Sequence, residues 1–483
     1  MFIIPKRVRR QIFAALSCCI GPLMVGSIAE WSASAFPKIR SNELDFRLSI
    51  FQEAWVINTI YAGIMVGPLL AGIAMDAIGR KSTLLLFTVF AITNWTLVTF
   101  APNKYILYLG RFCGGIWAGC VITIVPAFLA EILEPDVRGS LGSLFVMMYF
   151  AGNLYENLIG PYVTYRAFCL ISSAPVFVFG ATFAFIPETP YYYMMKGQRK
   201  RAEASLTWLR GDADVAVELD KIGAYAETFM KQRGSFKDLI FNESYRKAFW
   251  NVQGVYFIQK LCGAFTVLAY LTVIIPKRVG PLAPSNCTQI TGVVLLLSTF
   301  SSTFLLDAVG RKPLFVISNI GIIVTTSITG AWYFLDGHTN FNMAGTTYVP
   351  FLGILLYGGF FCVGVGPIAS IYQGEVLPSN IKARASTVTT MMSAFASIVN
   401  TTLFAVCNRY IGIYVNFFLF ALTSVFGLYF AKYHFIETKG KTLQEIQEEL
   451  MMSYKKRKAS AMSGKLGVHQ VPIPHSLKTA TKR

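Results

Sequence analysis

Residues 72–81 read Gly-Ile-Ala-Met-Asp-Ala-Ile-Gly-Arg-Lys, and residues 307–312 repeat the end of this stretch as Asp-Ala-Val-Gly-Arg-Lys. Two further pairs recur in the same order. One is a Glu followed by a basic side chain two turns later (Glu131 with Arg138, then Glu375 with Lys382), and the other is a Glu-Thr pair (Glu188-Thr189, then Glu437-Thr438). Chance rarely repeats three motifs in one order. The chain is therefore predicted to contain two related halves, a plan known among membrane transporters.

Long apolar stretches flank the copies of these motifs. The 483 residues are 54% hydrophobic and 14% charged, whereas a soluble domain carries about 25% charged residues. A helix that crosses a bilayer needs about 20 mostly apolar residues. Twelve segments have approximately that length and composition: 11–35, 52–75, 83–101, 105–130, 139–162, 166–186, 248–275, 289–307, 313–335, 349–374, 384–407 and 411–433.

The spans divide into two sets of six on either side of a polar insert. We predict an all-α integral membrane protein with twelve transmembrane helices in two pseudo-symmetric six-helix halves and a helical insert in the cytoplasm. The predicted units are residues 1–187 (first half), 188–247 (insert), 248–450 (second half) and 451–483 (a disordered basic tail). Basic residues gather beside the spans near both chain ends, so the positive-inside rule places both termini in the cytoplasm.

Composition also argues against several classes of protein. The net charge of +18 does not indicate a nucleic-acid partner, because the basic residues are grouped in the polar gaps beside the spans. The four histidines lack metal-ligand spacing, and no nucleophile, paired-carboxylate or nucleotide motif stands out. We therefore expect no enzyme, no metal and no cofactor. The expected partners are a small-molecule solute and the lipid bilayer.

The duplicated motifs place opposite charges at the cytoplasmic ends of the spans. Unpaired charges there are costly, so we expect them to pair. Gly79 permits a sharp turn, and Asp76 is expected to cap a neighbouring helix. The pairs would form a gate, closed when paired and open when parted; a positive-inside signal alone is the other interpretation. The predicted gate contains Asp76, Arg80, Lys81, Arg111, Glu131, Arg138, Glu188, Asp307, Arg311, Glu375, Lys382 and Glu437.

The same motifs resemble those of a known family. Residues 72–81, Gly110-Arg111, Glu131 to Gly139, Pro187-Glu188-Thr189-Pro190, Gln259-x-x-x-Gly263 and Glu437-Thr-Lys-Gly440 together resemble the sugar-porter family of the major facilitator superfamily. Residues 26–37 are most similar to its insect trehalose and hexose facilitators. The resemblance covers about residues 10 to 450. It implies a central sugar site, a place in the plasma membrane, and either uniport or proton symport.

The residues that the resemblance assigns to sugar binding depart from the family pattern. In the seventh span the family offers Gln-Gln-x-Ser-Gly-x-Asn, whereas residues 259–265 read Gln-Lys-Leu-Cys-Gly-Ala-Phe. Gln259 is kept, Lys260 replaces the second Gln, and Phe265 replaces the Asn. Val146, Leu295, Ser370 and the pair Ser393-Ala394 occupy other expected amide and aromatic positions. Each lost hydrogen-bond partner removes about 1 kcal/mol or more of sugar binding.

Two ionisable residues lie inside spans instead. Glu30 is in the first span and Lys260 in the seventh, and intramembrane charges are functional candidates by default. If these spans face each other, the two could form a structural ion pair, a proton-coupling site, or a recognition site for a charged or zwitterionic solute. Glu156 is expected on a solvated outer rim. The predicted substrate-binding residues are Gln259, Lys260, Glu30 and Trp31, with Tyr149, Ser370 and Ser393 as weaker candidates.

We predict a secondary transporter that moves a small polar solute across the plasma membrane by alternating access, with a sugar (hexose or trehalose) as the first choice of solute. The alternatives are a transporter of a charged or zwitterionic organic solute, and a sensor that binds a ligand without moving it. Uptake separates transporter from sensor. Asn286-Cys287-Thr288 fits an N-glycosylation acceptor in a predicted external loop.

Overall fold

A computed structural model describes residues 6–134, 137, 141–211, 215–231, 236–276, 279–339, 343–378, 381–441, 445–446 and 448–449. Over these residues the chain is nearly all helical, and its extended pairing is one isolated β-bridge between Val279 and Leu282. The predicted tail 451–483 and the predicted gate residue Arg138 lie outside the described residues.

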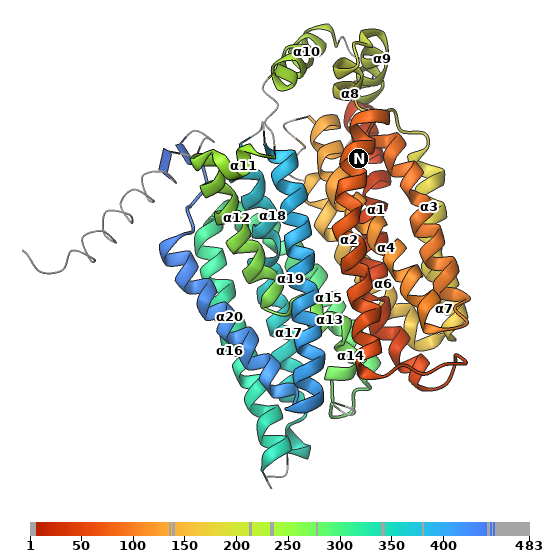
Figure 1. The fold of residues 1–483 in the computed structure, drawn as a ribbon, viewed down its shortest axis with the longest axis vertical. Helices are drawn as coiled ribbons and strands as arrows, with labels where there is room; N and C mark the ends of the chain where they lie inside the picture. Colours follow the sequence, from red (N-terminus) through yellow and green to blue (C-terminus); the bar gives the residue numbers. More distant parts are fainter. Residues whose placement is uncertain are drawn as a thin grey trace, which may run out of the picture.

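The helices form two bundles that stand side by side (Figure 1). The first bundle contains α1 (Lys6–Arg40), α2 (Ile50–Ile78), α3 (Arg80–Thr99), α4 (Lys104–Ile132), α6 (Leu144–Ile159), the 3-10 turn η1 (Gly160–Tyr162) and α7 (Tyr165–Phe183). The insert follows as α8 (Pro190–Met195), α9 (Arg199–Arg210), α10 (Ala216–Lys231) and α11 (Asp238–Phe241). The second bundle contains α12 (Glu243–Leu261), α13 (Ala264–Ala269), α14 (Leu271–Ile274), α15 (Pro284–Val309), α16 (Arg311–His338), η2 (Ala344–Thr346), α17 (Tyr348–Val363), α18 (Val365–Val376), α19 (Lys382–Tyr410) and α20 (Ile413–Tyr433).

The insert marks one end of the molecule. Helices α8, α9 and α10 lie beyond one end of the bundles, next to the start of α1 (Figure 1). We call this the insert end and the opposite one the distal end. Helix α1 runs from the insert end to the distal end, α2 runs back, and α3 and α4 repeat this alternation.

The predicted spans correspond to helices in the same order. Among the described residues, 11 helical segments are long and apolar enough to cross a membrane. Within the predicted fifth span, 139–162, the structure describes α6 with 16 residues and η1, whereas residues 139–140 lie outside its described part.

The predicted seventh span, 248–275, is not one helix. It begins earlier, at Glu243, and breaks at Gly263, which has a φ of +93°. A Cβ at Gly263 would lie 2.4 Å from the ring of Phe420, so the position requires glycine. The break frees the carbonyl of Cys262 from the helix, and the hydroxyl of Tyr357 donates to it (2.8 Å). Non-helical backbone at membrane depth is tolerated where protein groups satisfy it in this way.

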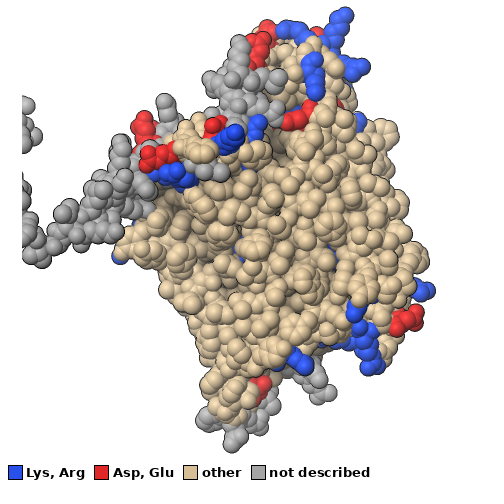
Figure 2. Space-filling model, in the orientation of Figure 1, with Lys and Arg blue, Asp and Glu red and all other residues tan. Residues whose placement is uncertain are grey.

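The surface between the two ends is apolar. Lys, Arg, Asp and Glu gather at the insert and distal ends, and a broad uncharged belt separates them (Figure 2). Large apolar side chains in this belt face outward, for example Ile73 (74% exposed), Phe177 (66%) and Leu422 (64%). An exposed apolar surface of this extent is typical of contact with lipid.

Small residues allow close approach between helices inside the first bundle. A Cβ at Gly26 of α1 would lie 1.9 Å from the carbonyl oxygen of Tyr149, and one at Gly152 of α6 would lie 2.0 Å from that of Leu23. These contacts press α1 against α6, as is common in membrane helix pairs. The pairing matters for function because both helices carry candidate residues.

The bundles contact each other through α2 with α19, α6 with α15, and α1 with α13 and α14. Hydrogen bonds that join described residues of the two bundles lie in the distal part. They are Ser32 Oγ to Ala269 O (3.4 Å), Thr272 Oγ1 to Ala33 O (2.5 Å), Asn58 Nδ2 to Thr402 Oγ1 (2.8 Å), and Gln289 Nε2 to Tyr162 Oη (3.3 Å) and Asn157 O (3.4 Å). The structure is thus a conformation whose distal end is bonded shut.

Candidate functional site

At the insert end of the first bundle, four side chains connect three segments. Arg80, at the start of α3, forms an ion pair with Glu131 in the last turn of α4 (Nη2 to Oε1, 3.0 Å). The hydroxyl of Thr189 donates to the other oxygen of Glu131 (2.5 Å). Glu188 accepts hydrogen bonds from the backbone N–H groups of Arg80 and Lys81 (both 3.0 Å). We call Arg80, Glu131, Glu188 and Thr189 the first cluster.

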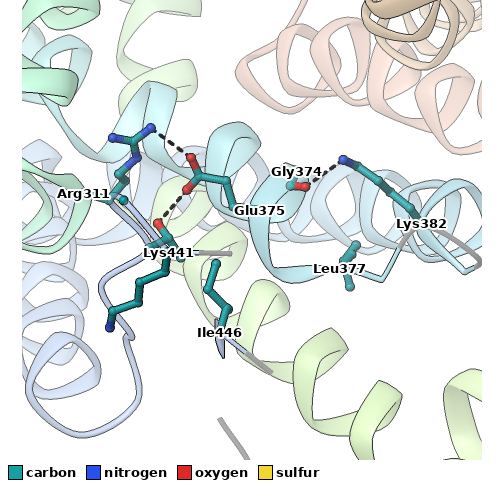
Figure 3. A pocket seen from close by; sticks show the side chains of 9 residues that line it. Arg311, Gly374, Glu375, Leu377, Lys382, Lys441 and Ile446 are labelled. Atoms are coloured by element: carbon teal, nitrogen blue, oxygen red, sulfur yellow. Dashed lines mark hydrogen bonds and ion pairs between the residues drawn. The ribbon is translucent and has the colours of Figure 1, made fainter. Parts of the chain in front are cut away.

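The second bundle repeats this construction. Arg311, at the start of α16, pairs with Glu375 of α18 (Nη2 to Oε1, 2.9 Å), and the hydroxyl of Thr438 donates to the other carboxylate oxygen (2.5 Å). Glu437 accepts from the backbone N–H groups of Arg311 (3.1 Å) and Lys312 (2.8 Å). Arg311, Glu375, Glu437 and Thr438 form the second cluster, and Figure 3 shows Arg311 and Glu375 in it.

Each cluster caps a helix with a carboxylate from a distant segment. Glu188 binds the first N–H groups of α3, where the helix dipole favours negative charge. The preceding Gly79 has a φ of +97°, and a Cβ there would lie 2.2 Å from Glu188 Oε2. Glu188, and not Asp76, thus caps α3, and the expectation that Asp76 caps a neighbouring helix stays a prediction. Asp76 lies in the last turn of α2, ahead of the turn, whereas the free N–H groups of α3 are bound by Glu188.

Both ion pairs join segments of one bundle. They brace each bundle at the insert end and do not tie the bundles together. The gating role stays a prediction, in which the pairs stabilise each bundle in one conformation and do not join the two bundles. Lys81 Nζ donates to Ala184 O (2.7 Å) and Lys382 Nζ to Gly374 O (2.7 Å). Asp307 lies in the last turn of α15, and its side chain is outside the described part of the chain.

Arg111 does not belong to the first cluster. An α-helix rises about 1.5 Å per residue, so Arg111 lies roughly 30 Å along α4 from Glu131, towards the distal end. Its side chain is fully buried and stacks on the ring of Trp31 (Cζ to centroid, 4.6 Å). One guanidinium nitrogen donates to the carbonyl of Ile28, while Nε and Nη1 have no hydrogen-bond partner.

A pocket of about 280 Å³ lies beside the second cluster (Figure 3). Three of its lining residues are basic, but each already has a polar contact. Arg311 pairs with Glu375, Lys382 binds the carbonyl of Gly374, and Lys441 pairs with Glu449 outside the lining set (2.5 Å). The pocket is part of the second cluster's packing.

Gln259 and Lys260 lie at the end of α12, just before the break at Gly263. The Gln259 amide donates to the carbonyl of Gly366 in α18 (2.6 Å), and its own oxygen is buried without a partner. Lys260 places its Nζ over the ring of Phe265, 3.8 Å from the centroid. Phe265 in turn contacts Tyr149 of the first bundle (centroids 6.4 Å apart). Lys260 and Phe265 therefore lie where the two bundles meet.

The weaker candidates have different surroundings. Tyr149 is at this interface through its contact with Phe265. Ser370 is exposed and donates to Pro367 O (2.9 Å), and Ser393 is buried and donates to Thr390 O (2.9 Å). Both serines thus donate their hydroxyl hydrogens to carbonyl oxygens of nearby residues in their own helices. A residue not predicted, Asn400 of α19, donates to Lys260 O (3.0 Å) and to Thr266 Oγ1 (3.1 Å) and supports the break in α12–α13.

Glu30 and Trp31 lie inside the first bundle and not beside Lys260. Glu30 is 1% exposed and accepts from Asn157 Nδ2 (3.1 Å). Trp31 is fully buried between Arg111 and Tyr165, and its indole N–H points at Cys169 Sγ (3.3 Å). The predicted approach of Glu30 to Lys260 is therefore absent in this conformation, because Glu30 projects from the face of α1 that packs on α6.

Glu156 is not on a solvated rim. It is fully buried, and its carboxylate accepts from Ser27 of α1 and from Ser172 of α7 (2.9 Å). Its charge acts on Arg111 without a direct ion pair. Glu156 lies near the end of α6, as predicted, but α1 and α7 cover it.

Known proteins resemble this chain in sequence and in fold. The profile of the family described as sugar (and other) transporter matches residues 24–450. This chain belongs to that family. Two curated relatives are the facilitated trehalose transporter Tret1 of Polypedilum vanderplanki (31% identical over 453 residues, 92% of this chain and 89% of the relative) and the Tret1-2 homolog of Drosophila simulans (31% over 445 residues, 91% of each).

Solved structures place this family member in the major facilitator fold. The proton:xylose symporter XylE bound to 6-bromo-6-deoxy-D-glucose superposes with a TM-score of 0.75 at 19% identity, over 92% of this chain and 100% of that one. The inward-open conformation of XylE from E. coli gives 0.74 at 19% identity, over 90% and 99%. The fold prediction, a two-bundle helical membrane protein, is confirmed.

In this member of the sugar-transporter family, several polar residues inside the helices contact the candidate residues and were not predicted from the sequence. Asn157 joins Glu30 to α6 and offers its backbone oxygen to Gln289 of the second bundle (3.4 Å). Ser27 and Ser172 hold Glu156, and Asn400 supports the broken helix. Their only sequence signal is a polar side chain within an apolar stretch, which many packing serines and asparagines share.

Asn286 is exposed in the first turn of α15, while the neighbouring Cys287 and Thr288 are buried. The Thr288 hydroxyl donates to Ser285 O (2.8 Å). Glycosylation at Asn286 stays a prediction.

The second cluster predicts an acid-dependent loss of stability. Burial alone would raise the pKa of Glu437, but the backbone N–H groups of Lys439, Lys312, Arg311 and Thr438 donate to the carboxylate and hold its pKa below the ordinary value of 4.5. A folded-state pKa below the unfolded one stabilises the fold at pH values above 4.5, and this contribution disappears as the pH falls through the folded-state pKa. Glu437→Gln should therefore cost about 1–2 kcal/mol at pH 7 and much less at pH 3.

The measurement is the apparent melting temperature of the detergent-solubilised protein and of Glu437→Gln between pH 7 and pH 3. The gap between the two should narrow with acid. A gap that stays constant over this range would show that the charge on Glu437 contributes nothing.

Proposed function

We propose that this chain is a secondary transporter that moves a sugar, a hexose or trehalose, across the plasma membrane by alternating access. Its family is that of sugar transporters, and its curated relatives are named as facilitated trehalose transporters. In the proposed orientation the insert end and both chain termini face the cytoplasm, which agrees with the basic residues beside the spans. The distal end then faces outward, and the described conformation is closed on that side.

One observation in the structure carries the proposal. Gln259, the amide that the chain keeps from the array that the resemblance assigns to sugar binding, has a buried carbonyl oxygen without a partner. A buried acceptor without a donor is unfavourable. Gln259 precedes Lys260 in α12, and a sugar hydroxyl can supply the missing donor. The amide N–H is held by Gly366 O (2.6 Å), which fixes the direction of the free oxygen.

Uptake of labelled glucose and trehalose into proteoliposomes tests the proposal directly. We expect saturable uptake of at least one sugar by the wild type. Gln259→Ala should lower kcat/KM by about tenfold, because one buried hydrogen bond is worth roughly 1–1.5 kcal/mol. Gln198→Ala, in the exposed insert, is the matched control and should transport normally.

The same assay decides between the proposal and its alternatives. Ligand binding without flux by correctly folded protein would make the chain a sensor. Equal loss in Gln259→Ala and Gln198→Ala would remove Gln259 from the site. Repeating uptake at two external pH values tests proton coupling, for which the buried carboxyls Glu30 and Glu156 are the candidates on the first bundle. XylE is a proton symporter by name, whereas the Tret1 relatives are named facilitated transporters.

A further inference from the structure

Lys260 carries a charge at the bundle interface that no other described side chain balances. Its Nζ makes no hydrogen bond and no ion pair with another described residue, and its close contact is the face of Phe265, 3.8 Å from the ring centroid. The stem of Lys260 is partly buried in α12. Phe265 also contacts Tyr149 of α6 and Phe361 of α17, with centroids 6.4 Å and 5.7 Å away.

The buried carboxyls Glu30 and Glu156 of the first bundle have other partners than Lys260. Glu30 is held by Asn157 on α6, and Glu156 by Ser27 and Ser172 on α1 and α7. The ring of Phe265 offsets part of the cost of the buried ammonium. A cation at membrane depth without an anionic partner nevertheless remains strongly unfavourable.

Gln259 lies next to Lys260 in the chain and brings a second unsatisfied group to the same place. The Gln259 oxygen is buried without a donor, and among the described residues the contact of the Lys260 ammonium is the ring of Phe265. The two complement a ligand that offers both a hydroxyl and an anionic oxygen. Tyr149, Phe265 and Phe361 provide apolar ring surface beside them.

We propose that Lys260 binds a carboxylate on the transported solute, so that the preferred substrate is a sugar acid and not the parent neutral sugar. This inference rests on the proposed function, sugar transport, and changes the preferred solute from a neutral hexose to the corresponding sugar acid. A charge-assisted hydrogen bond from ammonium to carboxylate is stronger than a neutral one. When the bundles close over the solute and exclude water, a carboxylate neutralises Lys260, whereas a neutral sugar leaves its charge buried. Discrimination against the neutral sugar therefore comes from a penalty as well as from an attraction.

The test compares uptake of labelled D-glucuronate and D-glucose, at equal concentration and pH 7, by proteoliposomes containing the wild type, Lys260→Gln, Lys260→Arg or Lys432→Gln. The first variant restores the amide that the family resemblance expects at this position. Lys432, exposed on α20, is the matched control for loss of a lysine. Wild type should take up glucuronate with a kcat/KM at least tenfold above that for glucose.

We expect Lys260→Gln to lose this preference by roughly 10- to 100-fold through lower glucuronate uptake, with glucose uptake unchanged or increased. Lys260→Arg should keep most of the preference, and Lys432→Gln all of it. An equal fall for both solutes in Lys260→Gln would reduce Lys260 to a structural role and overturn the inference. Uptake of glucose alone by the wild type would overturn the inference and leave sugar transport intact. If the wild type takes up none of glucuronate, glucose and trehalose, both the inference and the proposed function are overturned.

Lys260 must also bind the carboxylate without transport. Addition of unlabelled glucuronate should raise the melting temperature of the solubilised wild type and not that of Lys260→Gln, provided that both variants elute as the same monodisperse species. Equal shifts in the two would contradict the inference even if a variant transports poorly.

Discussion

Glu156→Ala is expected to destabilise the protein by about 3 kcal/mol, the largest effect of any single carboxyl removed from the first bundle. Glu156 is fully buried and accepts hydroxyl hydrogen bonds from Ser27 and Ser172, so it holds α1, α6 and α7 together. It is also the carboxylate whose charge acts on the buried Arg111. Removal leaves two buried hydroxyls without an acceptor and a cavity among three packed helices, which together typically cost about 3 kcal/mol.

Glu156→Gln separates charge from hydrogen bonding. The amide keeps the shape and one acceptor oxygen, so we expect this variant to lose less than half as much stability as the alanine variant. The measurement is thermal unfolding in detergent, followed by the fraction of monodisperse protein after heating. Equal losses in the two variants would assign the whole effect to the charge. Wild-type stability of the alanine variant would show that Glu156 does not brace the bundle.

Hydropathy and the repeated motifs were enough to predict the two-bundle fold. A bilayer forces each crossing segment to satisfy its own backbone, so length and composition locate the spans. The break at Gly263 was missed because glycine is common inside membrane helices and has no local sequence signal for a break. The positive φ of Gly263 and the ring of Phe420, packed where a Cβ would lie, make this glycine obligatory.

The candidate site was predicted less well, for a geometric reason. Sequence fixes how deep a residue lies in a span, but not which neighbour its helix face meets. Lys260 lies over Phe265, which contacts Tyr149 of the other bundle, and its role in binding stays a prediction. Glu30 and Trp31 lie on a comparable stretch of α1, yet they turn towards α6 and Arg111, because the close approach at Gly26 and Gly152 sets the rotation of α1.

The sequence also did not show which distant carboxylate caps which helix. The repeated Asp-x-x-Gly-Arg-Lys motif suggested that Asp76 caps a neighbouring helix, and it did not indicate which carboxylate caps the start of α3. Glu188 occupies that place although it lies 108 residues from Arg80 in the chain. The repeat of Glu437 on Arg311 shows that the Glu-Thr motif and the Gly-Arg-Lys motif are two parts of one structure.

The second large effect is expected in transport. Glu131→Gln and its counterpart Glu375→Gln should each slow uptake by about 30- to 100-fold while the protein stays folded. At the insert end each carboxylate forms an ion pair with an arginine (3.0 Å for Glu131, 2.9 Å for Glu375). Each also accepts a hydrogen bond from a threonine hydroxyl (2.5 Å in both). The pairs are largely shielded, with Arg80 6% and Arg311 15% exposed. Losing about 2–3 kcal/mol in one conformation shifts its population by that factor.

The direction of the shift follows from the conformation in which the clusters are formed. Both clusters are intact while the distal end is bonded shut through contacts such as Asn58 to Thr402 (2.8 Å). Weakening a cluster should therefore disfavour the distal-closed state and raise the reactivity of a single cysteine introduced near Asn58 towards a membrane-impermeant reagent. Glu203→Gln, on the exposed face of α9, controls for loss of a carboxylate near the insert.

Because the clusters have the same construction, Glu131→Gln and Glu375→Gln should behave alike. A defect in one and not the other would mean that they do different work, and normal uptake in both would leave them as braces without a part in gating.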